Sequence, residues 1–230
     1  MLLPLRDENP LRIIPFQLVT VGIIAICAAV FLYEMSLTPR AIEAFVYAYG
    51  IIPAVLFDVR TLPPGLDRIP AEATLVTSLF LHGGVAHLVG NMLYLWIFGD
   101  NIEDSMGHVR FLVFYLVCGV AASLTHALLD PSSTVPLVGA SGAISGVLGA
   151  YVVLHPRVKV LVMVTFPFTM HLPAFVLLGG WIAVQVFNYW IGGAGQIAWL
   201  AHIGGFIAGI ALIGFFRRRA VPLFDRGTRH

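Results

Sequence analysis

The stretch Gly139-Ala140-Ser141-Gly142-Ala143-Ile144-Ser145-Gly146-Val147 places a serine among small residues at the start of an apolar run. A second apolar run opens with Ala201-His202-Ile203-Gly204-Gly205. Small residues beside both side chains would let the two runs pack closely as helices. A hydroxyl and an imidazole at the ends of two adjoining helices could act as a nucleophile and its base. The remaining sequence tests this interpretation.

The composition indicates an integral membrane protein. Of 230 residues, 59% are apolar and only 11% are charged, and the mean hydropathy is +0.91. A soluble domain carries roughly 25% charged residues. With a net charge of +1 and no basic tract longer than Arg217-Arg218-Arg219, no nucleic-acid partner is expected. Cys27 and Cys118 lie in apolar runs and are interpreted as buried hydrophobic residues without a disulfide.

Six apolar runs predict an all-α membrane protein with six transmembrane helices, since a span needs roughly 20 apolar residues. Glycine, proline and aspartate separate the expected helices, which lie at 16–37, 75–98, 109–129, 141–155, 172–191 and 200–216. The membrane domain then covers 16–216, between an N-terminal segment 1–15 and a basic tail 217–230. The first run exceeds the hydrophobic region of a signal peptide, about 7–15 residues, so we expect it to be retained. Residues 158–171, interrupted by Pro167, are expected to form an interfacial connection.

The distribution of Lys and Arg predicts the orientation, because cytoplasmic loops carry more of them. With the N-terminus inside, ten basic residues lie in inner segments and three, Arg40, Arg60 and Arg68, in outer ones. Both termini are therefore expected in the cytoplasm. This topology brings four polar residues to the outer end of the bundle, namely His82, His87, Ser141 and His202.

Ser141 has two interpretations. Serine is common in membrane helices as a small packing residue. At a helix start, however, unpaired N–H groups and a positive partial charge favour an oxyanion. The neighbouring glycines and alanines also leave room for a substrate backbone to approach. Ser141 is therefore the candidate nucleophile.

His202 could be a hydrogen-bonded structural residue or the base. Small residues form a face beside it and a matching face on the earlier run, namely Ala201, Gly205 and Gly209 against Gly142, Gly146 and Ala150. If these faces meet, Ser141 can hydrogen-bond His202, whose neutral imidazole could remove the serine proton and return a proton to the leaving group. No Asp or Glu in a span lies near His202, so a dyad is expected.

His87 and Asn91 are four residues apart and share one helix face. Both can donate hydrogen bonds and could complete an oxyanion hole with the Ser141 backbone N–H. The alternative is a polar pair that holds helices together. A metal bound by the histidines is not expected, because the sequence has no His-Glu-x-x-His motif.

Taken together, the motifs resemble the rhomboid family of intramembrane serine proteases, of the six-helix bacterial type. Gly139-Ala140-Ser141-Gly142 is similar to the nucleophile motif, Ala201-His202-Ile203-Gly204-Gly205 to the histidine motif, and His87-Leu88-Val89-Gly90-Asn91 to the oxyanion element. The resemblance also implies structural roles for His82 and for Glu103, which lies in a Gly99-xxx-Glu103-xxx-Gly107 element.

The resemblance implies a rhomboid-like bundle that cleaves transmembrane-anchored proteins at or near their membrane segment, without a cofactor or metal, in the bacterial inner membrane. It also implies a lateral gate near the fifth helix and a cap loop at about 192–199. The chain departs from the family's pattern at Ser145, where many relatives carry an aromatic residue that stacks on the histidine. Our hypothesis is that the Ser145 hydroxyl, or a water molecule that it holds, helps orient His202. The Trp-Arg pair of the first loop is also missing, with Ala73-Thr74 roughly in its place.

The sequence thus predicts a serine endopeptidase with a Ser141–His202 dyad, whose partners are transmembrane substrates and the lipid bilayer. Two alternatives stay open. A catalytically inactive relative would bind transmembrane clients without cleaving them. A small transporter would be expected to carry ionisable residues near the membrane midplane or a duplicated architecture.

Overall fold

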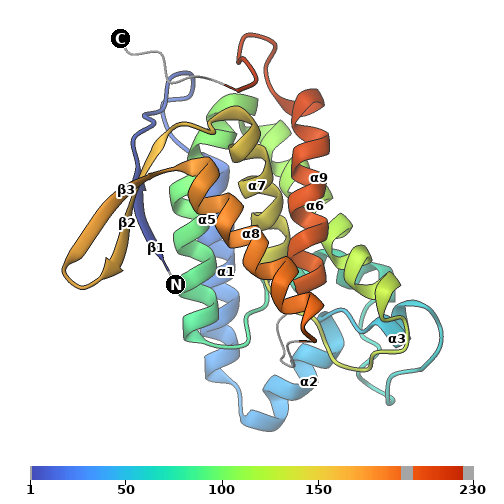
Figure 1. The fold of residues 1–230 in the computed structure, drawn as a ribbon. Helices are drawn as coiled ribbons and strands as arrows, with labels where there is room; N and C mark the ends of the chain where they lie inside the picture. The colour runs from blue at the N-terminus through green and yellow to red at the C-terminus, as the bar shows by residue number, and fades with distance from the viewer. Residues whose placement is uncertain (1, 193–198, 225–230) are drawn as a thin grey trace.

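The computed structural model describes residues 2–192 and 199–224, and most of them are helical (Figure 1). The longer helices pack side by side and alternate in direction. Their bounds are α1 Leu18–Ser36, α2 Pro39–Tyr49, α3 Pro53–Leu56, α4 Thr74–Thr77, α5 Val85–Met106, α6 His108–Leu129, α7 Ser141–Leu154, α8 Ala174–Trp190 and α9 Trp199–Phe216. Two short 3₁₀ turns, η1 Ala71–Ala73 and η2 Ser78–Phe80, flank α4.

Within the described residues, three helices are long and apolar enough to cross a membrane, namely α1, α6 and α9. The pair Ala71–Phe80 and Val85–Met106, bent by 82°, makes a fourth span if it is counted as one. The helices α7 and α8 are apolar but shorter. These features fit an integral membrane protein with a helical bundle.

The helix α7 occupies the centre of the bundle, and every residue from Gly142 to Tyr151 is buried. A helix that is apolar or small on all sides is stable only when other elements surround it. Glycines allow the neighbours to come close: a Cβ on Gly205 would overlap the Gly142 carbonyl oxygen, and one on Gly209 would overlap that of Gly146. The α7 and α9 backbones are therefore in direct contact along the two small-residue faces.

The helix α5 differs from the expected helix 75–98 at both ends. It begins at Val85, after Gly83 and Gly84, and residues 74–80 form separate short turns. It also continues through Gly99-Asp100-Asn101, where the sequence suggested a stop, and ends at Gly107, whose φ of +85° favours glycine. The helix can continue because the acidic residues of its last turns have partners inside the fold.

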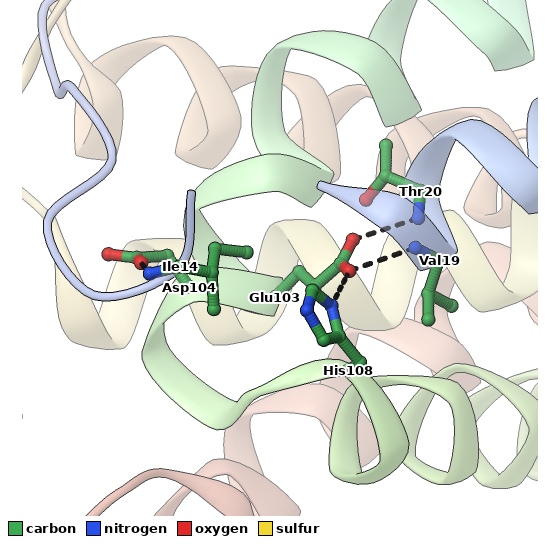
Figure 2. Close-up of polar contacts among 6 residues, drawn as sticks. All are labelled: Ile14, Val19, Thr20, Glu103, Asp104 and His108. Carbon is green, nitrogen blue, oxygen red and sulfur yellow. Dashed lines mark hydrogen bonds and ion pairs between the residues drawn. The ribbon is translucent and has the colours of Figure 1, made fainter. Parts of the chain in front are cut away.

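Figure 2 shows two of these acidic residues, Glu103 and Asp104, with their partners. Glu103, fully buried, accepts hydrogen bonds from the backbone N–H groups of Val19 (2.9 Å) and Thr20 (2.8 Å) and contacts His108 Nδ1 at 2.5 Å. Those two N–H groups belong to the first turn of α1 and have no acceptor within that helix. Asp104 accepts in the same way from the backbone of residues 12–14 at 2.7–3.0 Å. We call the end of the bundle that holds these two residues the carboxylate end, and the opposite end, where α7 and α9 begin, the site end.

The described residues also contain a three-stranded antiparallel sheet, so the all-α expectation needs correcting. Its order is β1 (Leu3–Asp7), β2 (Lys159–Thr165), β3 (Phe168–Pro173), and Leu3 pairs with Met163. The segment 158–171, expected as an interfacial connection, is mostly a hairpin, and the N-terminal segment supplies the third strand. Burial explains the hairpin, because Val160 and Val162 alternate inward against the helices. The sheet lies along the flank of the bundle, beside α5 and α8 (Figure 1).

The first loop also holds structure that was not expected. The helix α2 follows Thr38, whose side chain accepts from the Ala41 N–H at 3.4 Å, and begins at Pro39. Proline suits the first position of a helix because its missing N–H would have no partner there. The short helix α3 was not expected either, whereas α1, α6, α7, α8 and α9 begin and end within two residues of the expected bounds.

Candidate active site

The backbone that leads into Ser141 is held by the first loop and the turn before α5. Ile51 and Leu137 exchange two backbone hydrogen bonds of 3.0 and 2.7 Å, and the Gly139 N–H donates to the Ser78 carbonyl at 2.9 Å. Gly139 adopts a φ of +128°, a conformation that L side chains rarely adopt. These contacts place Ser141 at the first position of α7, where its backbone N–H has no acceptor within the helix.

Ser141 and His202 form a short hydrogen bond. The distance between Ser141 Oγ and His202 Nε2 is 2.8 Å, across the contact between α7 and α9. Both residues lie in the first turn or so of their helices, and the glycine contacts keep these turns close. The structure therefore brings together the two residues that the sequence suggested as nucleophile and base.

The other ring nitrogen of His202 has a partner that the sequence analysis missed. Gln185 Oε1, from α8, lies 2.8 Å from His202 Nδ1, and the Trp181 ring lies against the imidazole with centroids 5.6 Å apart. A signal was available, because polar side chains in membrane helices are costly and mark candidate sites. The contact was missed because the two residues are 17 apart along the chain and lie on different helices.

In the described part of the chain, the hydroxyl of Ser145 is directed at the backbone of α7, while the ring nitrogens of His202 bond to Ser141 and Gln185. The Ser145 side chain is fully buried, and its hydroxyl donates to the Ser141 carbonyl oxygen one turn earlier, at 2.6 Å. Ser145 thus supports the first turn of α7, whereas Gln185 and Trp181 contact the imidazole.

His87 and Asn91 face the backbone before Ser141. A Cβ on Gly139 would lie 2.8 Å from His87 Nε2 and 3.8 Å from Asn91 Nδ2. Asn91 Nδ2 is buried and has no hydrogen-bond partner among the described residues. Both side chains, with Ser141 and His202, line a cavity of about 530 Å³ whose other walls come from α7, α8 and the segment before Ser141. An unpaired amide donor beside the nucleophile suits the binding of an oxyanion.

His82 lies behind the site. It is 3% exposed, its ring packs edge-on against His87 with centroids 5.2 Å apart, and neither ring nitrogen has a partner among the described residues. The structural role expected for His82 stays a prediction. Of the expected cap loop, 193–198 lie outside the described residues, as do 225–230 of the basic tail.

Comparison with known proteins now adds the family. The rhomboid domain model matches residues 71–219, which is more than half of the chain and includes α5, α7, α8 and α9, the helices that carry the side chains of the site. The chain belongs to the rhomboid family. The family resemblance inferred from the sequence motifs is thereby confirmed.

Several rhomboid proteins are similar to this chain. It is 31% identical over 164 residues to Rhomboid protein 1, mitochondrial, of Saccharomyces cerevisiae, covering 67% of this chain and 44% of that protein. It is 33% identical over 138 residues to RHOMBOID-like protein 5 of Arabidopsis thaliana, covering 60% and 42%. It is 36% identical over 138 residues to Rhomboid protease GluP of Bacillus subtilis, covering 60% and 25%. The chain therefore spans less than half the length of these relatives.

Proposed function

We propose that this rhomboid-family chain is an active intramembrane serine endopeptidase with a Ser141–His202 dyad. The observation that carries the proposal is the 2.8 Å hydrogen bond between Ser141 Oγ and His202 Nε2 on the wall of an open cavity. A nucleophile and base within hydrogen-bond reach are the arrangement that acyl transfer requires. The relative named as a rhomboid protease, GluP, supports the same conclusion.

In the first half of the reaction, Ser141 Oγ attacks the carbonyl carbon of the scissile bond while His202 Nε2 takes the hydroxyl proton. The tetrahedral intermediate carries a negative oxygen, which would accept hydrogen bonds from the Ser141 backbone N–H, Asn91 Nδ2 and His87 Nε2. When it collapses, the imidazolium returns the proton to the leaving amine and an acyl ester remains on Ser141.

In the second half, a water molecule enters the cavity and gives a proton to His202 Nε2 as its oxygen attacks the ester carbon. The second tetrahedral intermediate uses the same donors. It releases Ser141 Oγ, which recovers its proton from His202, and the product leaves as a carboxylic acid that loses its remaining proton to water. No group beyond these side chains and water is needed to balance the protons.

The substrates proposed are proteins anchored by a membrane segment, because the site opens inside a helical bundle that itself lies in lipid. The bias of Lys and Arg favours six spans with both termini in the cytoplasm and the site toward the outer face. The resemblance of the motifs to the six-helix bacterial type is the basis for proposing the bacterial inner membrane as the location. The helix α8, which exposes Phe175, Val184 and Phe187, is the proposed lateral gate.

The test is cleavage of a single-span model substrate by the purified protein in liposomes, beside Ser141→Ala. Cleavage by the wild type that disappears in the variant is expected. Cleavage by both would contradict Ser141 as the nucleophile. If neither cleaves and a fluorophosphonate probe fails to label Ser141, the chain is an inactive relative that binds transmembrane clients.

A further inference from the structure

Resting on the proposed protease function, we infer that Gln185 and Trp181 of α8 are positioning residues for His202. Gln185 fixes which ring nitrogen carries the proton, and Trp181 limits the rotation of the ring. The helix α8 would thus supply what orients the base, in place of the aromatic residue that is absent at Ser145.

The hydrogen bonds of Gln185 determine how its amide is turned. Its side chain is 6% exposed, and Nε2 lies 3.3 Å from the Trp181 backbone carbonyl oxygen, one helical turn earlier. A carbonyl oxygen only accepts hydrogen bonds, so the amide NH₂ must face it. This leaves Gln185 Oε1 directed at His202 Nδ1, at 2.8 Å.

The orientation of the amide then determines the tautomer of the histidine. Gln185 Oε1 can only accept, so His202 Nδ1 must carry the proton of the neutral ring. The lone pair is left on Nε2, the nitrogen that lies 2.8 Å from Ser141 Oγ. A base needs this form, because a protonated Nε2 could not take the serine proton. In this series of hydrogen bonds the donors are therefore Gln185 Nε2, His202 Nδ1 and Ser141 Oγ, and the reverse assignment is not possible.

Trp181 adds a steric constraint. Its ring plane makes an angle of 39° with the imidazole at a centroid distance of 5.6 Å, and it also lines the cavity. Trp199 contacts the same imidazole edge-on, at 6.4 Å and 84°. A ring held by a hydrogen bond on Nδ1 and by contacts with two indoles cannot turn Nε2 away from Ser141 without breaking these contacts.

A neutral amide suits this location better than a carboxylate. An ionised Asp or Glu inside an apolar bundle would carry a large desolvation cost. The Gln185 carbonyl dipole still points at Nδ1–H and stabilises the positive charge that develops on the ring during proton transfer. The amide therefore orients and polarises the base while keeping the resting site uncharged.

The test compares three variants in the liposome cleavage assay. Gln185→Met keeps the length of the side chain but has no strong acceptor, and kcat should fall by about 10-fold to 10²-fold with KM little changed, as when an orienting partner of a histidine is lost. Gln185→Glu keeps an oxygen that can accept from Nδ1–H but carries the cost of a buried carboxylate, so it should retain more of kcat than Gln185→Met and less than the wild type. Asn188→Ala is the matched control, because Asn188 is an amide on the same helix that donates to the Val184 carbonyl at 2.8 Å.

A wild-type kcat in Gln185→Met would overturn the inference, and so would an equal loss in Asn188→Ala, which would indicate general damage to α8. If Gln185→Met does not fold, ¹⁵N spectra of histidine-labelled wild type, assigned with His202→Gln, decide the matter. A proton on Nδ1 is expected, and a proton on Nε2 would contradict the inference. These results differ from failure of the proposed function, in which the wild type itself neither cleaves nor reacts with the serine probe.

Discussion

The two ends of the bundle treat their polar groups in opposite ways. At the carboxylate end, Glu103 and Asp104 are ionisable, yet Glu103 accepts two backbone hydrogen bonds from the first turn of α1 and Asp104 accepts three from the segment before it. At the site end, Ser141, His202 and Asn91 are uncharged or easily kept neutral, and Asn91 keeps an unpaired donor beside an open cavity.

The difference indicates how to separate structural from catalytic polar residues in a membrane bundle. A buried group whose hydrogen-bond capacity is filled by backbone holds the fold together. A buried group with unused capacity, next to space that a substrate can enter, is available for chemistry. The four predictions that follow test this contrast, starting with the largest expected effect.

The dyad should behave as one unit. Ser141→Ala and His202→Ala should each lower kcat/KM by on the order of 10⁴ or more, and the double variant should lose no more than either single one, because residues that act together are non-additive. Thermal unfolding in detergent should hardly change. If the loss of kcat/KM in the double variant equalled the product of the two single losses, the two residues would act independently and this prediction would be wrong.

Removing one of the oxyanion donors proposed above should reduce activity less than removing a member of the dyad. The reduction should appear in kcat more than in KM. Asn91→Ala and His87→Ala should each lower kcat by about 10²–10³, the loss seen when one oxyanion donor is removed. The measurement is a KM-against-kcat comparison in the same liposome assay. A change confined to KM would instead assign these residues to holding the substrate.

At the other end, Glu103→Gln should reduce stability and leave catalysis intact. The amide offers one accepting oxygen in place of two, so a backbone N–H of α1 loses its partner, at a cost of about 2–3 kcal/mol in unfolding free energy. The exposed Glu43 on α2 gives the control, Glu43→Gln. If Glu103→Gln lowered kcat per folded molecule, the carboxylate end would also contribute to catalysis, and the contrast between the two ends would be wrong.

The smallest effect should come from Asp7, at the carboxylate end. Burial raises the pKa of Asp7 to about 6 from 3.8, against the lowering effect of the hydrogen bond from the Tyr151 hydroxyl. The folded state then binds more protons than the unfolded one between about pH 4 and 6, so stability should fall as pH rises through that window. Asp7→Asn removes the titrating group and should flatten the fall in unfolding curves measured from pH 4 to 7.

The sequence predicted the site end well because its signals are local. Ser141 and His202 each begin an apolar run, and the glycine spacing after them showed that the two runs could touch. The contact of Gln185 with His202 could not be predicted in the same way. It depends on how α8 is rotated against α9, and periodicity cannot show that for a helix that is apolar on most sides.

The carboxylate end was predicted less well because its partners are distant in the sequence. Asp100 and Glu103 suggested the end of a span, since charges usually avoid lipid. The helix α5 nevertheless continues through these residues. Backbone N–H groups more than 80 residues earlier in the chain donate hydrogen bonds to Glu103 and offset the cost of burying its charge. The sheet was missed for the same reason, because β2 is completed by a strand that precedes α1.

The pairing of β1 with β2 has a consequence for biogenesis. A ribosome makes Leu3 long before Met163, its partner in the sheet, and α1, α5, α6 and α7 are synthesised in between. During that interval β1 has no neighbouring strand, and the apolar side chains of Leu3 and Leu5 have to be accommodated by the insertion machinery or the bilayer surface. The strand β1 can therefore pair only after β2 has been synthesised, and the sheet can form only after most of the bundle has been inserted.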